Sequence, residues 1–330
     1  MKLNHSKTTK LTNMAVKTTP FFQPINSHNI GALMREAVRR MCTTIHRQRL
    51  NFKFEGKTVD YKQGADFVSS ADKDAQLIAL DFLGRNFPDF GIIAEEDDLF
   101  KDAKEFHYTD GSVHRFFFSL DPLDGTKAFI RKQSDSYSSM ISFIHEINGV
   151  ATVIGVCIGD PMTGEMYYTR PDSPRVHLLD RDTDISKILK FDIEMIPSET
   201  YALLREPVYE YPSIVRKLVN EGGLDRDNFF FKPESVGGSV GISFAKLWKD
   251  QYGMLALKAG KTTVWDSAPC IGICSKLGFV PMVVNTQGRL EESKFFIHTK
   301  RENMDQRETI IVHKTLVPRI IEWQKETLML

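Results

Sequence analysis

Residues 116–126 read Phe-Phe-Phe-Ser-Leu-Asp-Pro-Leu-Asp-Gly-Thr, an apolar run that delivers two carboxylates, a glycine and a hydroxyl to one tight turn. The run from Val113 to Leu120 predicts a buried strand, and Pro122, which has no N–H to donate, is expected to end it. Asp121 would then lie at the strand end, with Asp124 one turn later. A helix is expected to begin at residue 127, and its N-terminal amides would favour an anion. The turn therefore has the groups that a site for hard cations and phosphate requires.

The two aspartates of this turn must be explained together. An isolated Asp-Gly after a strand is usually a helix cap. A carboxylate at the end of a buried strand costs several kcal/mol to desolvate unless a cation or hydrogen-bond donors compensate. Because Asp121 and Asp124 lie three residues apart, they favour a metal site.

Two further acidic clusters follow apolar segments. Residues 95–98, Glu-Glu-Asp-Asp, come directly after the short apolar run 90–94, and Asp266 follows Trp265 just before a helix expected over 270–277. For the first cluster the alternative is a solvated acidic loop. For Asp266 the alternative is an ordinary N-cap with Pro269 in the first turn. Taken singly, either alternative is about as good as a functional role.

In their order and separations, these elements resemble those of the inositol monophosphatase superfamily, which are magnesium-dependent, lithium-sensitive phosphomonoesterases. The family's Asp-Pro-(Ile/Leu)-Asp-Gly-Thr element is met in full by residues 121–126. Its Glu-Glu, Trp-Asp-x-Ala and Val-(Thr/Ser)-x-x-Asp elements look like residues 95–96, 265–268 and 68–72. The six-residue element is highly specific, and the likeness extends from about residue 30 to about residue 290.

The resemblance implies a fold, whereas the residue patterns alone indicate only a mixture of α and β. Helical periodicity over 30–49 and 72–87, and alternating strand signals over 137–147, 150–158 and 165–168, predict two helices and an antiparallel meander. The family's fold is an α+β layered αβαβα sandwich of the inositol monophosphatase and fructose-1,6-bisphosphatase type. We expect a disordered tail at 1–28, an α+β domain at 29–172 with most of the metal ligands, and an α/β domain at 173–330 that contributes Asp266.

The resemblance also implies roles for individual residues. Glu95, Asp121 and the backbone carbonyl of Leu123 would hold a first magnesium ion. Asp121, Asp124 and Asp266 would share a second, and Glu95 would touch a third, weaker ion. Asp124 and Asp266 would also border the substrate.

The remaining implied roles concern the phosphate and the attacking water. Gly125 and Thr126 would present amides and a hydroxyl to the phosphate. Asp72 would hydrogen-bond Thr126 or the nucleophilic water, so that Asp72, Glu95 and Thr126 form the expected catalytic group.

The expected function is magnesium-dependent hydrolysis of a small phosphorylated metabolite by metal-activated water, without a phosphoenzyme. The substrate stays open between an inositol phosphate and a 3'-phosphonucleotide, because Ala128 and Ile242 depart from the pattern of the bisphosphate nucleotidases. A phosphate-ester-sensing or partner-binding protein that keeps the cation site with little turnover is the alternative from another class.

Composition agrees with a cytoplasmic enzyme. Forty-three acidic residues balance forty-three basic residues among 330, so no global basic field attracts nucleic acid or an acidic membrane. No apolar segment reaches the roughly 18 residues of a membrane span. The four cysteines match neither a zinc site nor a disulfide framework, which favours a reduced cytoplasmic setting. The oligomeric state stays open, with a homodimer expected from what is common in the family.

Overall fold

The structure is a computed structural model that describes residues 26–56, 67–180, 185–191, 201–219, 232–260, 263–297, 299 and 307–327. The helices in these ranges are α1 (Ser27–Gln48), α2 (Ser70–Asn86), α3 (Thr126–Ile130), α4 (Ser213–Leu218), α5 (Val240–Trp248), α6 (Val264–Leu277) and α7 (Val317–Thr327), with 3-10 turns η1 (Glu96–Asp98) and η4 (Val208–Glu210). The strands of the first half are β1 (Phe54–Gly56), β2 (Phe67–Ser69), β3 (Gly91–Ala94), β4 (Phe100–Lys101), β5 (Phe106–His107), β6 (Val113–Asp124), β7 (Ser138–Ile147), β8 (Val150–Gly159), β9 (Met166–Thr169), β10 (Val176–Leu179) and β11 (Ser186–Leu189). Those of the second half are β12 (Tyr201–Leu204), β13 (Lys232–Ser235), β14 (Met254–Leu257), β15 (Phe279–Val284), β16 (Leu290–Glu292) and β17 (Thr309–His313).

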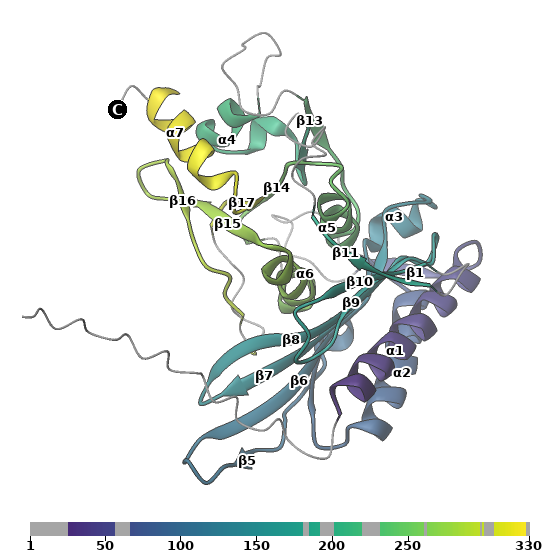
Figure 1. Ribbon diagram of the computed structural model, residues 1–330. Coiled ribbons are helices and arrows are strands. Elements are labelled where there is room, and N and C mark those ends of the chain that lie inside the picture. Colours follow the sequence, from purple (N-terminus) through teal and green to yellow (C-terminus); the bar gives the residue numbers. More distant parts are fainter. Residues whose placement is uncertain are drawn as a thin grey trace, which may run out of the picture.

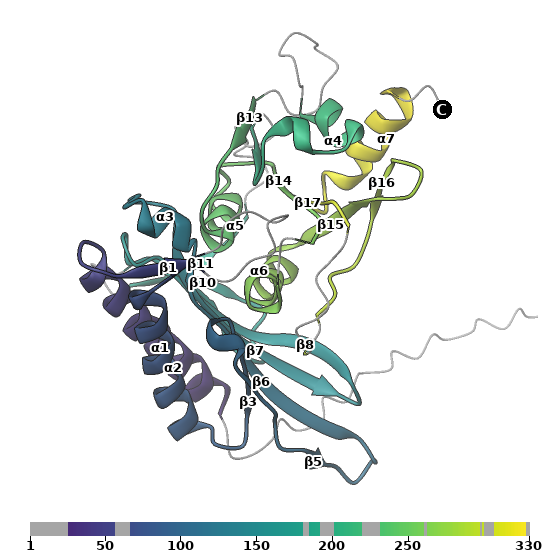
Figure 2. The same cartoon turned by 180° about the vertical axis from the view of Figure 1, so that it is seen from behind.

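Two mixed sheets alternate with three layers of helices (Figure 1 and Figure 2). Helices α1 and α2 cover the outer face of the first sheet, and α5 and α6 fill the space between the two sheets. Helices α4 and α7 cover the outer face of the second sheet. This order of layers confirms the predicted αβαβα sandwich.

The first helix shows how the sequence pattern produces a layer. In α1 the buried side chains recur at helical spacing, so one apolar stripe faces the sheet. The Asn26 side chain accepts a hydrogen bond from His28 N at 2.8 Å and caps the helix. The helix predicted over 30–49 is confirmed, but it begins at Ser27, inside the stretch assigned to the tail. Residues 1–25 of that predicted tail lie outside the described residues.

The first sheet has the strand order β11-β10-β9-β8-β7-β6-β3-β4, and β5 pairs with β6. Its meander β7-β8-β9 is antiparallel, as predicted, and Asn148 and Gly149, both at positive φ, form the turn between β7 and β8. Strand β3 is parallel to β6. Strands β10 and β11 also belong to this sheet although they lie beyond residue 172; the division into domains stays a prediction.

Strand β6 does not end before Pro122, as the sequence suggested, but continues to Asp124. The reason is a break in its register with β7. Asp121 pairs with Met140 and Asp124 with Ser138, so the proline lies in the irregular stretch between two paired positions. The Pro122 carbonyl accepts a hydrogen bond from Ser139 Oγ at 2.8 Å, which fixes that stretch against β7.

The second sheet has the order β13-β12-β14-β17-β15-β16 in the described ranges, with parallel pairing of β12 to both β13 and β14. Helix α6 joins the two sheets. Gly272 on α6 allows a close approach to the first sheet, since a Cβ there would lie 2.5 Å from side-chain atoms of both Val153 and Val156 on β8. The same helix packs against β15 of the second sheet.

Candidate functional site

The side chain of Asp121 lies on the face of strand β6 that packs against helix α6. Phe116, Phe118 and Leu120 pack into the core beneath α1 and α2, whereas Phe117 packs with Trp265 of α6 on the opposite face. Because side chains alternate along a strand, Asp121 shares the face of Phe117. Its side chain is almost completely buried on that face.

The register break brings Asp124 to the same place. Regular alternation would put Leu123 on the α6 face and Asp124 on the other, but Leu123 is buried in the core under α1 and α2. The irregular stretch therefore reverses the alternation. Asp124 Oδ2 accepts hydrogen bonds from Ser239 Oγ at 2.5 Å, Gly241 N at 2.8 Å and Ser138 Oγ at 3.3 Å.

Gly125 completes this turn with a left-handed backbone. Its φ is 93°, and a Cβ at this position would lie 2.4 Å from the carbonyl oxygen of Ser136 and 2.8 Å from Ser239 N. Ser239 N in turn donates to the Ser136 carbonyl at 2.8 Å. Only glycine fits both the backbone conformation and the space.

Asp266 is the third residue of α6 and not its N-cap, which corrects the simpler interpretation of the sequence. Thr263 caps the helix, and Asp266 Oδ2 accepts hydrogen bonds from Thr263 N at 2.9 Å and Thr263 Oγ1 at 2.8 Å. The pair forms a capping box, and Pro269 lies inside the helix beyond the first turn. The helix begins before Trp265, not near residue 270, because the capping box supplies the start signal upstream.

The three aspartates converge. One carboxylate oxygen from each of Asp121, Asp124 and Asp266 lies within 4.8 Å of the others. Asp121 Oδ1 is buried and has no hydrogen-bond partner among the described residues. A buried carboxylate oxygen without a donor costs free energy unless a cation compensates. An all-oxygen set of this kind fits a hard divalent cation such as Mg²⁺.

Glu95 lies at the edge of this cluster. Its backbone N–H donates to the Leu120 carbonyl at 3.1 Å, so β3 ends beside β6 and delivers Glu95 next to Asp121. The Glu95 carboxyl lies near enough for its charge to raise the pKa of Asp121.

Burial and mutual repulsion govern the ionisation of the acids when no cation is bound. Burial, followed by the charges of Glu95, Asp124 and Asp266, raises the pKa of Asp121 well above its usual range. Burial and the charges of Asp124 and Glu95 raise the pKa of Asp266 to about 7. The carboxylates therefore favour the ionised state only when a positive charge lies among them.

A second pair of oxygens lies beside the acidic cluster. Thr126 Oγ1 is 2.8 Å from Asp72 Oδ1 and 3.0 Å from the Leu123 carbonyl oxygen, and can donate to either. Asp72 is the third residue of α2, where it accepts hydrogen bonds from the N–H and the hydroxyl of Ser69 in a capping box. Burial is the main cause that raises the pKa of Asp72 to about 6.

A pocket of about 160 Å³ opens over two of the aspartates, and its wall comes largely from the second half of the chain. It is lined by Asp124, Arg205, Glu206, Val240, Leu257, Lys258 and Asp266. Arg205 donates to the carbonyls of Gly238 and Ser239, so its charge holds the turn that binds Asp124. Lys258 Nζ donates to Glu210 Oε2 at 2.9 Å.

Sequence reasoning missed the residues that position the aspartates. Ser138, Ser239 and Arg205 had no part in the predicted site, because their partners are distant in sequence. The signal that was present is the glycine-rich stretch 236–241, which indicates close backbone packing against another element.

Comparison with known proteins places the chain in the family that its sequence motifs resemble. The profile of the inositol monophosphatase family matches residues 29–316. Inositol-1-monophosphatase of Rhizobium meliloti is 34% identical over 109 residues, covering 33% of this chain and 36% of the relative. The Nus factor SuhB of Vibrio cholerae is 31% identical over 106 residues, covering 32% and 34%. The chain thus matches about a third of the length of these two relatives.

A longer match is to histidinol-phosphatase of Chlorobaculum parvum, 26% identical over 219 residues, or 64% of this chain and 70% of the relative. Among solved structures, an inositol monophosphatase of Thermotoga maritima superposes with a TM-score of 0.59 at 17% identity, covering 92% of this chain and 99% of the other. A structure titled IMPase/NADP phosphatase with Mg²⁺ and phosphate gives a TM-score of 0.59 at 16% identity, covering 90% and 95%. At these identities the structures demonstrate the fold alone.

Proposed function

The chain belongs to the inositol monophosphatase family, and we propose that it hydrolyses a small phosphate monoester with the help of divalent cations. The observation that carries the proposal is the convergence of Asp121, Asp124 and Asp266 around a buried oxygen without a donor. A structural cap would explain Asp266 alone. It would not explain why β6 breaks its register to bring Asp124 beside Asp121.

We assign the cations to oxygen ligands only. Asp121, Asp124 and Asp266 would hold them, with Glu95 on the Asp121 side and the Leu123 carbonyl as a further ligand. That carbonyl lies 3.0 Å from the Thr126 hydroxyl, and its second lone pair stays available. When bound, Mg²⁺ would lower the pKa of a water molecule and neutralise charge on the departing oxygen.

Asp72 and Thr126 suit the removal of a proton from that water. When the Thr126 hydroxyl donates to Asp72, its oxygen keeps lone pairs that can accept a hydrogen bond from water. Thr126 would then take the proton of the water while its own proton moves to Asp72. A pKa of about 6 makes Asp72 a usable base near neutral pH.

The substrate would be a small hydroxylated phosphate ester. The pocket is modest in volume, and its wall combines an acid, Glu206, with a base, Lys258, so hydroxyl groups and a second anionic group could both find partners. The relatives suggest which esters to test, because their names refer to inositol 1-phosphate, histidinol phosphate and NADP chemistry.

The test is phosphate release from a panel that contains inositol 1-phosphate, histidinol phosphate, NADP and 3'-phosphoadenosine 5'-phosphate. Each would be measured with Mg²⁺, with Ca²⁺, with Mg²⁺ plus Li⁺ and with a chelator. We expect Mg²⁺-dependent release from at least one member. Inhibition by Li⁺ is a separate prediction that comes from the family resemblance.

Asp124→Asn tests the site itself. Asparagine keeps an oxygen that can accept from Ser239 and Gly241, so the fold should survive while one ligand charge is lost. We expect kcat/KM to fall by about 100-fold or more. The matched control is Asp81→Asn on the exposed face of α2, which should leave the rate unchanged. Ester binding without release by the unsubstituted protein would instead support a phosphate-ester sensor.

A further inference from the structure

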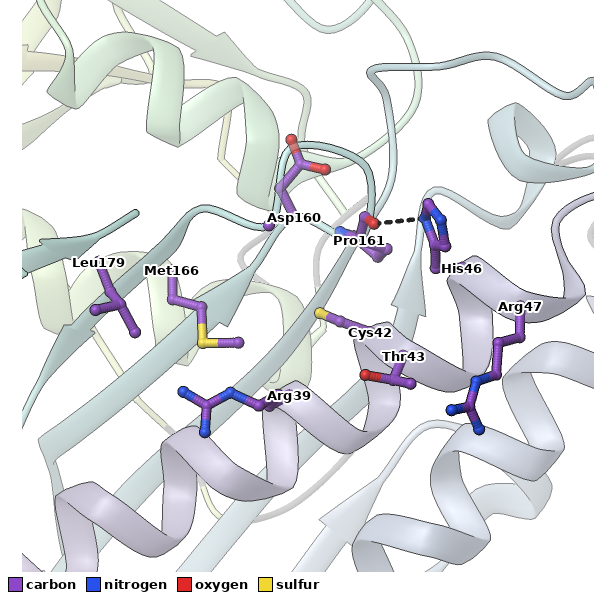
Figure 3. Close-up of a pocket in the computed structure, with 10 residues that line it drawn as sticks. Arg39, Cys42, Thr43, His46, Arg47, Asp160, Pro161, Met166 and Leu179 are labelled. Carbon is purple, nitrogen blue, oxygen red and sulfur yellow. Dashed lines mark hydrogen bonds between the residues drawn. The ribbon is translucent and has the colours of Figure 1, made fainter. Parts of the chain in front are cut away.

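A second cavity lies away from the acidic cluster. It has a volume of about 480 Å³ and lies between α1 and the turn that joins β8 to β9 (Figure 3). Its floor is apolar, formed by the buried side chains of Cys42, Met166 and Leu179. A cavity of this size falls within the range of sites that bind small organic molecules.

The rim of the cavity carries positive charge. Arg39, Thr43 and Arg47 follow one another at intervals of four residues and therefore line one side of α1. Arg39 pairs with Glu36 at 3.2 Å, and its side chain remains half exposed. Together with the exposed Arg47, it places two guanidinium groups beside the apolar floor.

The opposite wall is held in shape by its own hydrogen bonds. Asp160 Oδ1 accepts from Met162 N at 2.7 Å and from Thr163 N at 3.2 Å, which fixes the turn and partly offsets the charge of this carboxylate. His46 Nδ1 lies 3.0 Å from the Pro161 carbonyl oxygen and ties the turn to α1, as Figure 3 shows. These hydrogen bonds fix the turn and, through His46, its position against α1.

This cavity is separate from the acidic cluster. Helix α1 covers one face of the first sheet, and α6, which carries Asp266, covers the other (Figure 1 and Figure 2). None of the lining residues belongs to the site proposed for hydrolysis.

We propose that this cavity is a second binding site, for a small organic anion with an apolar body. The apolar part would pack on Cys42, Met166 and Leu179. The anionic group would lie at the rim, where Arg39 and Arg47 supply charge-assisted hydrogen bonds and Thr43 offers a hydroxyl. The inference does not depend on the hydrolytic activity.

The test uses phenylphosphonate, which combines an aromatic ring with a dianion and has a C–P bond in place of the ester. Binding to the full-length protein would be measured by calorimetry, once with Mg²⁺ and once with a chelator. We expect saturable binding at millimolar concentration or below in both conditions. Binding that requires Mg²⁺ would place the probe at the acidic cluster and overturn the proposal, as would a lack of saturable binding.

Two variants locate the binding. Arg39→Gln with Arg47→Gln removes the rim charges, and Thr43→Trp, at an exposed position, fills the mouth while keeping them. We expect each variant to weaken binding by about tenfold or more, and the Mg²⁺-dependent activity to stay unchanged. The control is Arg85→Gln with Arg319→Gln, two exposed arginines outside the cavity. If the control weakens binding equally, or if Thr43→Trp leaves binding unchanged, the probe binds through surface charge alone. Either result would overturn the proposal.

Discussion

Gly125 is the residue whose replacement should disturb the acidic turn most directly. Its left-handed backbone would strain any other residue, and a Cβ would meet backbone atoms of Ser136 and Ser239 that cannot move without the turn. We predict that Gly125→Ala lowers the free energy of unfolding by about 3 kcal/mol or more, adding overlap to conformational strain. Chemical denaturation measures this loss, and Mg²⁺-dependent activity should fall with it because Ser239 also binds Asp124.

Gly111→Ala is the matched control for strain alone. Gly111 has a similar φ of 82°, but a Cβ there would have no neighbour within 4 Å. We expect a loss of about 1 kcal/mol, from the backbone conformation only, with activity retained. A Gly125→Ala loss no larger than that of Gly111→Ala would contradict the packing argument.

Helix starts place two of the acids. Asp72 and Asp266 are each the third residue of a helix. Asp72 accepts hydrogen bonds from its helix cap Ser69, and Asp266 accepts them from its helix cap Thr263. The capping box serves two purposes at once, because it satisfies free amides and fixes the carboxylate that the site uses.

We predict that Thr263→Ala affects both the stability of the protein and its activation by Mg²⁺. It removes the hydroxyl that donates to Asp266, which should lower the free energy of unfolding by about 1 kcal/mol and weaken the activation by Mg²⁺ about tenfold. Activity titrated with Mg²⁺ gives the second quantity. Asn26→Ala, which removes the cap of α1, should cost similar stability without altering the Mg²⁺ dependence. If both variants shift the Mg²⁺ titration alike, the cap acts only on stability.

The elements themselves were largely predictable where one periodicity holds along a segment. The helices over 30–49 and 72–87 and the meander from residue 137 to residue 168 follow patterns that depend on neighbouring residues only. The end of β6 was not predictable, since its continuation past Pro122 depends on pairing with β7 across a register break. The start of α6 was missed because the capping box at Thr263 lies upstream of the apolar periodicity.

At the scale of the molecule, the site exists because two sheets meet at α6. Asp121 and Asp124 come from the first sheet, while Asp266, Ser239 and Arg205 come from elements of the second half. The motifs identified which acids belong together. The residues that hold them were not assigned to the site, because Ser138, Ser239 and Arg205 gain their roles only from long-range packing.

This assembly makes stability depend on pH and on cations together. Burial raises the pKa of Asp266 to about 7 and that of Asp121 well above its usual range, so the folded protein binds protons that the unfolded chain releases near pH 4. Without cations, stability should be greatest below about pH 4 as far as these two groups are concerned and should fall as pH rises toward 7. Mg²⁺ binds the ionised form, so the increase in Tm that it produces should grow from about pH 5 to about pH 8.

Thermal unfolding with Mg²⁺ and with a chelator, across that pH range, measures both effects. The sign follows from the direction of the pKa shifts, and each kcal/mol of stability corresponds to roughly 1–2 °C in Tm for a chain of this size. Asp266→Asn keeps the acceptor for Thr263 but cannot ionise, so without cations it should flatten the fall in Tm and, with Mg²⁺, it should reduce the gain. An increase in Tm from Mg²⁺ that is the same at both ends of the range, and the same in Asp266→Asn, would mean that the cation binds elsewhere.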